Sequence, residues 1–375
     1  MHLRKIEIAN FSCLRDVTVE FTDLHALIGP NDSGKSTILR SVRLLTQVLA
    51  STVHSENSLS AAPDIGVIGT AGTHLRGWFD SLDFEITIEH PRSGPGLAGL
   101  ASVKIEAGSP GGQRYSEVKS STSDLQGFFN RSPSLKNLVF SNPSLSSRIF
   151  KCAQLVRLDP DALRRDSELI PDDKSISFFE DSEEGIRGSR LPGIYDAIMN
   201  RGDESFAKIR EQTRAMFPTV RNVRLRTTSN SRKCLEVELV NGTRVPAAQM
   251  SEGLLYFLAY VALPYLAPPS ILLVEEPENG LHPSRIRDVM NILREISKTT
   301  QVIIATHSPL VVNELNYNEV TVVTREIEKG TQARKLTDAE DFKVRSEEFL
   351  PGELWLNYAN GVDEENLFQP RKSTP

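Results

Sequence analysis

The chain has 375 residues, a formal net charge of −6 and a hydrophobic fraction of 39%. These values are typical of a globular protein, and the length suffices for one large core with a subdomain or for two domains. No run of about 18 apolar residues occurs, and the first residues lack the apolar stretch of a signal peptide, so we expect no membrane association. The three cysteines have no metal-ligand spacing, which predicts reduced thiols and a cytoplasmic location.

Apolar periodicity predicts the first elements. Alternating residues indicate a hairpin over residues 3–8 and 17–21, and an apolar run predicts a third strand at 25–28. Helical spacing follows from about residue 36. The chain therefore opens with a hairpin and a strand–loop–helix unit.

The middle of the chain is less regular. Residues 50–74 indicate a surface excursion, and residues 122–165 indicate a mixed but mainly helical segment. An acidic stretch covers residues 166–184, and a basic stretch covers residues 207–233. A hairpin turn is predicted after a strand at 235–240. Two or three further strands are predicted at 82–88, 101–107 and 113–118.

The last part returns to alternating helices and strands. Continuous apolar runs at 271–274 and 302–305 fit a parallel sheet covered on both faces, with helices at 252–267 and 284–298. We predict three parts: 1–74 with the phosphate-binding loop, an inserted subdomain at 75–245, and 246–375 with the remaining motifs.

The sharpest motif matches G-x-x-x-x-G-K-[ST] between the third strand and the helix, the context that this motif requires. Its glycines let consecutive N–H groups point at phosphate oxygens, and the helix N-terminus adds its positive end. Lys35 would reach the β- and γ-phosphates, and Ser36 would ligate Mg²⁺. The residues predicted to bind ATP are Gly29, Pro30, Asn31, Asp32, Ser33, Gly34, Lys35, Ser36 and Thr37.

Two carboxylates follow the strand at 271–274, at the edge of the sheet where such a loop lies. We assign Glu275 to Mg²⁺ and Glu276 to the general base that polarises the attacking water. His307 follows the next apolar strand, where it would contact the γ-phosphate and sense its presence. The alternatives are solvated acids at a strand end and a structural histidine.

Ser251-Glu252-Gly253 stands just before a predicted helix. Ser251 is a good N-cap, and the helix N-terminus behind it is a second anion site. Such a site, far along the chain from the first, makes sense if it reaches a γ-phosphate held by another copy. We therefore expect ATP between two head-to-tail copies, although a simple helix cap stays an alternative.

The order of these motifs resembles the ABC-type ATPase heads of RecF, SMC and OLD proteins. In that resemblance, residues 251–253 are the signature motif, Glu275 and Glu276 the Walker B pair, and His307 the switch histidine. Residues 279–283 resemble the D-loop, which implies that Asn279 contacts nucleotide. The resemblance implies an α/β head with a mostly parallel P-loop sheet flanked by helices, an antiparallel β lobe and an inserted α+β subdomain.

The run 275–283 is similar to a bacterial family of predicted ATPases related to OLD proteins but without their TOPRIM nuclease domain. Glu275 departs from the usual aspartate, and Ser12 stands where a basic residue near adenine is common. A Q-loop glutamine cannot be placed, with Gln113 and Gln154 as candidates. No heptad run indicates an SMC rod, and too few residues follow His307 for a TOPRIM domain.

The resemblance implies an ATP- and Mg²⁺-dependent ATPase that acts as an ATP-driven homodimer. Its role would be that of a sensor or regulator in antiphage defence, controlling a separate toxin or nuclease. A RecF-like DNA-repair ATPase and a scaffold with little turnover are the alternatives. The basic stretch would contact DNA through Arg221, Arg224 and Arg226, or would pair with the acidic stretch instead.

Overall fold

A computed structural model describes residues 2–53, 72–80, 83–89, 102–108, 114–119, 153–168, 183–229, 231–326, 328–339 and 342–359. The chain divides into two compact units, Met1–Ala153 with Ile303–Pro375, and Gln154–Val302. Within the described residues, no helix is long and apolar enough to cross a membrane.

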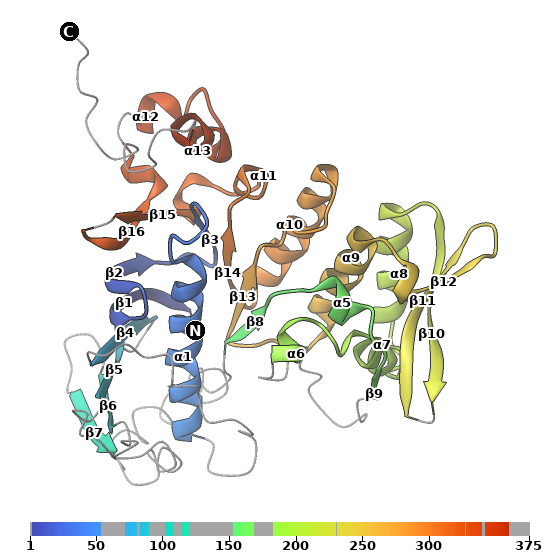
Figure 1. Ribbon diagram of the computed structural model, residues 1–375, viewed down its shortest axis with the longest axis horizontal. Coiled ribbons are helices and arrows are strands. Elements are labelled where there is room, and N and C mark those ends of the chain that lie inside the picture. The colour runs from blue at the N-terminus through green and yellow to red at the C-terminus, as the bar shows by residue number, and fades with distance from the viewer. Residues whose placement is uncertain are drawn as a thin grey trace. The chain divides into compact units, whose positions relative to one another are not determined.

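The first unit contains an antiparallel sheet with strand order β2-β1-β4-β5-β6-β7 (Figure 1). The predicted hairpin and the three predicted strands are confirmed, but strand β4, which pairs with β1, was not predicted. Because β4 pairs with β1, the strands β4 to β7 belong to the same sheet as the first hairpin. The strands are β1 (Leu3–Phe11), β2 (Leu14–Glu20), β4 (Thr73–Phe79), β5 (Asp83–Glu89), β6 (Ser102–Gly108) and β7 (Arg114–Lys119).

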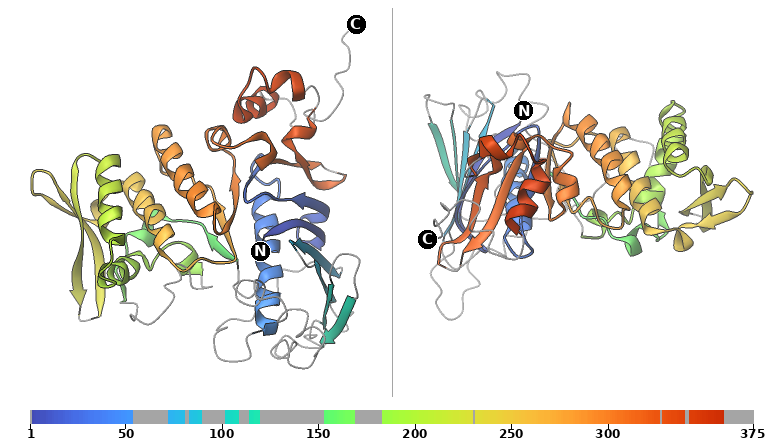
Figure 2. Two further views of the ribbon diagram at one scale, coloured as in Figure 1. Left: turned by 180° about the vertical axis from the view of Figure 1, so that it is seen from behind. Right: turned by 90° about the horizontal axis from the view of Figure 1, so that it is seen from above.

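Helix α1 (Lys35–Val53) packs against β1 and β4 of this sheet (Figure 2). The apolar residues that predicted the helix, among them Val42 and Leu45, are fully buried. Gly77 permits a close approach, because a Cβ there would lie 2.5 Å from the Leu45 side chain. The sheet and helix thus share one core, and the start of α1 is held rigidly.

A second sheet of the first unit has the order β16-β15-β3-β14. Strand β15 runs parallel to β3, with Val320 opposite Ala26 and Val322 opposite Ile28, and antiparallel to β16. Every residue of β3 and β14 is buried, as their continuous apolar runs predicted. The elements are β3 (Leu24–Ile28), β14 (Gln301–Thr306), β15 (Val320–Glu326) and β16 (Gly330–Lys335), followed by the helices α12 (Phe342–Arg345) and α13 (Pro351–Ala359).

In the second unit, β8 (Gln154–Val156) pairs in parallel with β13 (Ile271–Glu275). Residues 122–165 were predicted to be mixed but mainly helical. The described part of this segment, residues 153–165, contains the short strand β8 and the helix α5 (Pro160–Leu163), and residues 122–152 lie outside the described residues. Helix α9 (Glu252–Ala262) is shorter than predicted and continues as a 3₁₀ turn at Leu263–Tyr265 that contains Pro264.

The remaining elements of the second unit are helical, apart from one antiparallel sheet. Helices α7 and α8 lie against the strands β10 and β11 of that sheet (Figure 1). Its helices are α5 (Pro160–Leu163), α6 (Glu183–Ile186), α7 (Leu191–Asn200), α8 (Ser205–Met216) and α10 (Pro283–Ser297), and its sheet strands are β9 (Ser167–Glu168), β10 (Val220–Ser229), β11 (Arg232–Leu239) and β12 (Arg244–Pro246).

Candidate functional site

The predicted phosphate-binding loop joins β3 to α1 in the first unit. Gly34 has a φ of 107° and Asp32 a φ of 67°, so the loop curls through the left-handed region that glycine favours. A Cβ at Gly29 would overlap the carbonyl oxygen of Val323 on β15. The loop is therefore tightly wound against the end of β15, as a backbone that directs its N–H groups inward requires.

The Lys35 side chain reaches back across the loop that precedes it. Its Nζ atom lies 2.8 Å from the carbonyl oxygen of Gly29 and 2.6 Å from that of Pro30, and only 8% of the residue is exposed. The first turn of α1 contains no acidic residue. Lysine and helix N-terminus thus form a positive site suited to phosphate oxygens.

Two side chains that sequence reasoning missed hold the loop from the β15–β16 hairpin. The Thr331 hydroxyl donates to the carbonyl oxygen of Ser33 at 2.9 Å, and Arg325 Nη1 lies 2.7 Å from Asp32 Oδ2. The loop motif gives no local signal for them, since both depend on the pairing of β15 with β3.

The other predicted residues of the first unit are Asn31, Ser36 and Thr37 of the loop motif, and His307 after β14. Asn31 is exposed, Ser36 is half-buried, and the hydroxyl of Thr37 lies 3.5 Å from the Cys13 sulfur. His307 is exposed directly after β14, the neighbour of β3 in the sheet. The structure therefore places His307 at the end of a buried strand, as its sequence position predicted.

In the second unit, Ser251 is the exposed N-cap of α9, and its side chain makes no capping hydrogen bond. Glu252 in the first turn lies 3.8 Å from Arg164, measured between Oε1 and Nη2. Gly253 faces the loop after β13, because a Cβ there would lie 3.1 Å from the carbonyl oxygen of Gly280. The helix N-terminus is thus open, and the nearby acid has a basic neighbour.

The two predicted Walker B carboxylates differ in their surroundings. Glu275 ends β13 with its side chain 5% exposed, and its Oε2 atom lies 3.5 Å from Nε of Arg157. Glu276 has a φ of 46°, a strained backbone for a residue with a side chain, and accepts a hydrogen bond of 2.9 Å from Asn279 Nδ2. The first carboxylate is thus buried beside an arginine, and the second accepts a hydrogen bond from a side-chain amide.

The loop after β13 packs against helix α9 through Tyr256. A Cβ at Gly280, which has a φ of 67°, would overlap the Tyr256 ring. Burial and then the nearby Glu252 carboxylate raise the pKa of Tyr256 to about 12, so its phenol stays protonated. The phenol donates to the carbonyl oxygen of Leu158 at 3.4 Å.

The surroundings of Glu275 suit it as a ligand of a magnesium ion. Its Oε1 atom is buried without a hydrogen-bond partner, which is unusual for a carboxylate oxygen and would be satisfied by a cation. No group of three or more His, Cys, Asp or Glu in the described part of the chain could hold a metal by itself. Mg²⁺ commonly takes one or two protein oxygens together with phosphates and water, so a single carboxylate fits.

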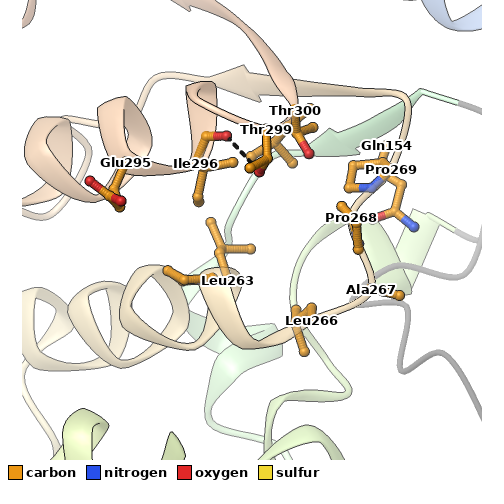
Figure 3. A pocket seen from close by; sticks show the side chains of 12 residues that line it. Gln154, Leu263, Leu266, Ala267, Pro268, Pro269, Glu295, Ile296, Thr299 and Thr300 are labelled. Carbon is orange, nitrogen blue, oxygen red and sulfur yellow. Dashed lines mark hydrogen bonds between the residues drawn. The ribbon is translucent and has the colours of Figure 1, made fainter. Parts of the chain in front are cut away.

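Of the two glutamines considered for a Q-loop, only Gln154 lies in the described part of the chain. Gln113 is outside the described residues, and Gln154 lies at the start of β8, opposite Leu272. Figure 3 shows Gln154 with Pro268 and Pro269 at the rim of a cavity of about 270 Å³ in the second unit. The residue beside Glu275 is Arg157 at the other end of β8, which sequence reasoning did not assign.

The basic stretch makes ion pairs within its own unit. Arg224 Nη1 lies 2.7 Å from Glu238 Oε2, and Arg221 Nη1 lies 3.6 Å from the second oxygen of the same carboxylate. Arg232 lies 2.9 Å from Asp166, the first residue of the acidic stretch. The predicted pairing between the two stretches is confirmed for Asp166, and residues 169–182 of the acidic stretch lie outside the described part.

The family described as "AAA domain, putative AbiEii toxin, Type IV TA system" matches residues 24–313, which contain every motif described above. The chain belongs to this family. It is accordingly a P-loop ATPase, and the expected relation to OLD-like and SMC-like ABC-type heads is confirmed.

Two solved structures are similar to the chain over most of its length. An SMC head bound to the C-terminal winged-helix domain of ScpA aligns with a TM-score of 0.51 and 13% identity, over 89% of this chain and 98% of that chain. An SMC head from Pyrococcus furiosus aligns with a TM-score of 0.47 and 14% identity, over 92% of this chain and 99% of that chain. At such identities only the fold of the first is shared.

One curated relative matches locally. The OLD nuclease of Thermus scotoductus (strain ATCC 700910 / SA-01) is 42% identical over 43 residues, which is 12% of this chain and 8% of that protein. The match therefore spans less than a tenth of that relative's length.

Proposed function

We propose that this ATPase is an ATP-gated homodimer in which the P-loop of one copy and the Ser251 motif of its twin grip the same triphosphate. The carrying observation is the open N-terminus of α9. Ser251 is exposed and makes no capping bond to its own helix, so its hydroxyl and the first N–H groups of α9 are available to an anion.

The charge near that helix end is consistent with this role. Glu252 would repel a phosphate, but the Arg164 guanidinium 3.8 Å away offsets its charge. The γ-phosphate supplies the difference in affinity between the open and closed states, because ADP lacks the group that both copies hold.

Within each site, Lys35 and the N–H groups of residues 29–37 bind the phosphates, and Ser36 and Glu275 hold Mg²⁺. Bound Mg²⁺ neutralises charge on the β- and γ-phosphates. Glu276 orients and polarises the attacking water, and its bond to Asn279 keeps the carboxylate in place. His307 senses the γ-phosphate.

The substitution Glu276→Gln tests the dimer. It removes the base and leaves the groups that bind the phosphates and Mg²⁺ unchanged, so we expect a stable dimer with ATP and Mg²⁺ and a monomer without them. Light scattering during size exclusion measures both states. A Glu276→Gln variant that stays monomeric at every ATP concentration would contradict the proposal.

Mixing two defective variants tests the sharing of each site. Lys35→Ala damages the P-loop, and Ser251→Arg blocks the motif offered to the twin. In a mixed dimer, one site carries both defects and the other carries neither. We expect ATPase activity to return on mixing, whereas mixing each variant with itself restores none. Two sites that are complete within one copy would give no gain.

The ATPase switch serves a regulatory role in antiphage defence, acting on a separately encoded toxin or nuclease. The support is the local identity to an OLD nuclease and the toxin–antitoxin description of the family. Affinity capture of the Glu276→Gln dimer from the native host, against Lys35→Ala as control, identifies the effector. Capture of the same proteins by both variants would contradict ATP-dependent control.

A DNA-repair role has less support, because Arg221 and Arg224 share the Glu238 carboxylate within their own sheet. Salt-sensitive DNA binding that disappears when Arg221, Arg224 and Arg226 are replaced would favour it. ATP binding without phosphate release, unaffected by Glu276→Gln, would instead favour a scaffold.

A further inference from the structure

Strand β8 brings an arginine to the end of β13. Gln154 pairs with Leu272, and Val156 pairs with Val274. The next residues, Arg157 just after β8 and Glu275 at the end of β13, therefore lie side by side. Arg157 Nε is 3.5 Å from Glu275 Oε2, both residues being in the second unit. The parallel register of the two strands therefore brings Arg157 next to Glu275.

The two partners differ sharply in exposure. The Arg157 side chain is 62% exposed, whereas that of Glu275 is 5% exposed. A long, exposed guanidinium can swing into water at small cost, but a buried carboxylate at a strand end cannot leave its place. The arginine is thus the movable member of the pair.

A magnesium ion at Glu275 would meet this guanidinium. Oε1 is buried without a hydrogen-bond partner and Oε2 faces Arg157. Two cations at one carboxylate repel each other, most strongly where water is excluded. Metal binding at Glu275 therefore works against the ion pair with Arg157.

The residues that follow Arg157 contact the Ser251 helix. The Leu158 carbonyl oxygen accepts from the Tyr256 phenol at 3.4 Å, and α5 packs against α9. Arg164, just after α5, lies 3.8 Å from Glu252 next to Ser251. A displacement of Arg157 thus acts on a segment that is joined at two points to the helix offered to the twin.

We propose that Arg157 is a positioning residue that holds Glu275 when no metal is bound and is displaced by Mg²⁺ and nucleotide, which couples metal loading to the Ser251 helix through residues 157–164. The inference rests on the proposed function for the role of Glu275. It assigns a role to the arginine that lies beside the proposed metal carboxylate.

Metal affinity tests the competition directly. Mn²⁺ replaces Mg²⁺ as the probe, and its free concentration is read by electron paramagnetic resonance in the presence of a non-hydrolysable ATP analogue. We expect Arg157→Gln to bind Mn²⁺ about five-fold more tightly than the wild type, the scale of a partly exposed ion pair. Arg157→Lys retains the charge and should stay close to the wild type.

Arg187→Gln is the matched control, because Arg187 is an exposed arginine of the same unit that forms no ion pair within the described part of the chain. It should leave Mn²⁺ affinity unchanged. An Arg157→Gln variant that binds Mn²⁺ as the wild type does, or more weakly, would overturn the proposal.

Thermal unfolding supplies a second readout that a purely structural arginine would not give. Without metal, Arg157→Gln leaves a buried carboxylate without its cation, so we expect its Tm to fall by about 2–4 °C. With Mn²⁺ and the analogue, its Tm should match the wild type. An equal fall in Tm with and without metal would assign Arg157 to folding alone and overturn its proposed displacement by metal.

Both measurements concern metal at Glu275 and keep their meaning in a monomer. A wild type that binds Mn²⁺ and the analogue but never dimerises would contradict the proposed dimer, while the comparison between Arg157 variants would still decide the present inference.

Discussion

The hydroxyl of Thr331, at the start of β16, donates a hydrogen bond of 2.9 Å to the carbonyl oxygen of Ser33 inside the phosphate-binding loop. Thr331 is fully buried, and a Cβ at Gly34 would lie 2.7 Å from the same hydroxyl. Together with the Arg325–Asp32 ion pair, this bond ties the loop to the β15–β16 hairpin. The curvature of the loop is therefore maintained from a distant part of the chain.

Replacing Thr331 by valine should weaken nucleotide binding. The substitution keeps the shape but leaves the Ser33 carbonyl without its donor, at a cost of about 1–3 kcal/mol. We expect ATP affinity, measured by titration with a fluorescent analogue, to fall about ten-fold. Thr331→Ser retains the hydroxyl and should restore most of it. Equal affinity of the valine variant and the wild type would rule out a role for this bond.

Lys35→Ala should abolish ATP binding. The Nζ atom, held between the carbonyl oxygens of Gly29 and Pro30, is the positive charge at the centre of the loop. We expect at least a hundred-fold loss in affinity by calorimetry with little change in Tm. Lys298→Ala, which removes an exposed lysine paired with Glu295, is the control. Unchanged affinity of Lys35→Ala would remove the assignment.

Features encoded in consecutive residues were predictable from the sequence. The loop of residues 29–37 and the apolar runs of β3, β13 and β14 are local signals, and the structure has strands at all three runs. Strand β4 was missed because its pairing with β1 joins segments far apart in the chain. The contacts of Arg157, Arg325 and Thr331 were missed for the same reason, since each depends on the pairing of distant strands.

Gly280→Ala should lower the free energy of unfolding by more than backbone strain at that position alone would. Gly280 has a φ of 67°, and a Cβ would overlap the Tyr256 ring. Gly202 has a φ of 68°, and a Cβ there would meet nothing within 4 Å, so Gly202→Ala isolates the strain, about 1 kcal/mol. We expect Gly280→Ala to cost about 1–3 kcal/mol more in urea unfolding.

The proposed ATP-dependent dimer should also be weaker in Gly280→Ala, because Tyr256 lies on the helix that begins at Ser251. Gly202→Ala should dimerise as the wild type does. If the two alanine variants are equally stable, the Tyr256 contact does not constrain this loop.

Acid should destabilise the first unit through His25 on β3. Burial lowers the pKa of His25 to about 3 from an ordinary 6.5, and the ring contacts Thr321 on β15 at 2.9 Å. Because the pKa of His25 is lower in the folded chain, the ring is protonated below pH 6.5 in the unfolded chain but only below about pH 3 in the folded chain. The stabilisation is complete above pH 6.5 and declines as the pH falls through this window.

Between pH 7.5 and 5.5, this single group should lower the free energy of unfolding by about 1.4 kcal/mol. His25→Gln is less stable at pH 7.5, because it loses buried ring contacts such as the edge-on packing against Phe21, but it should lack this component of the pH dependence. Urea unfolding of both proteins at the two pH values measures the difference, and the other histidines cancel in the comparison. A wild type and a variant that lose the same free energy on acidification would show that His25 is not the titrating group.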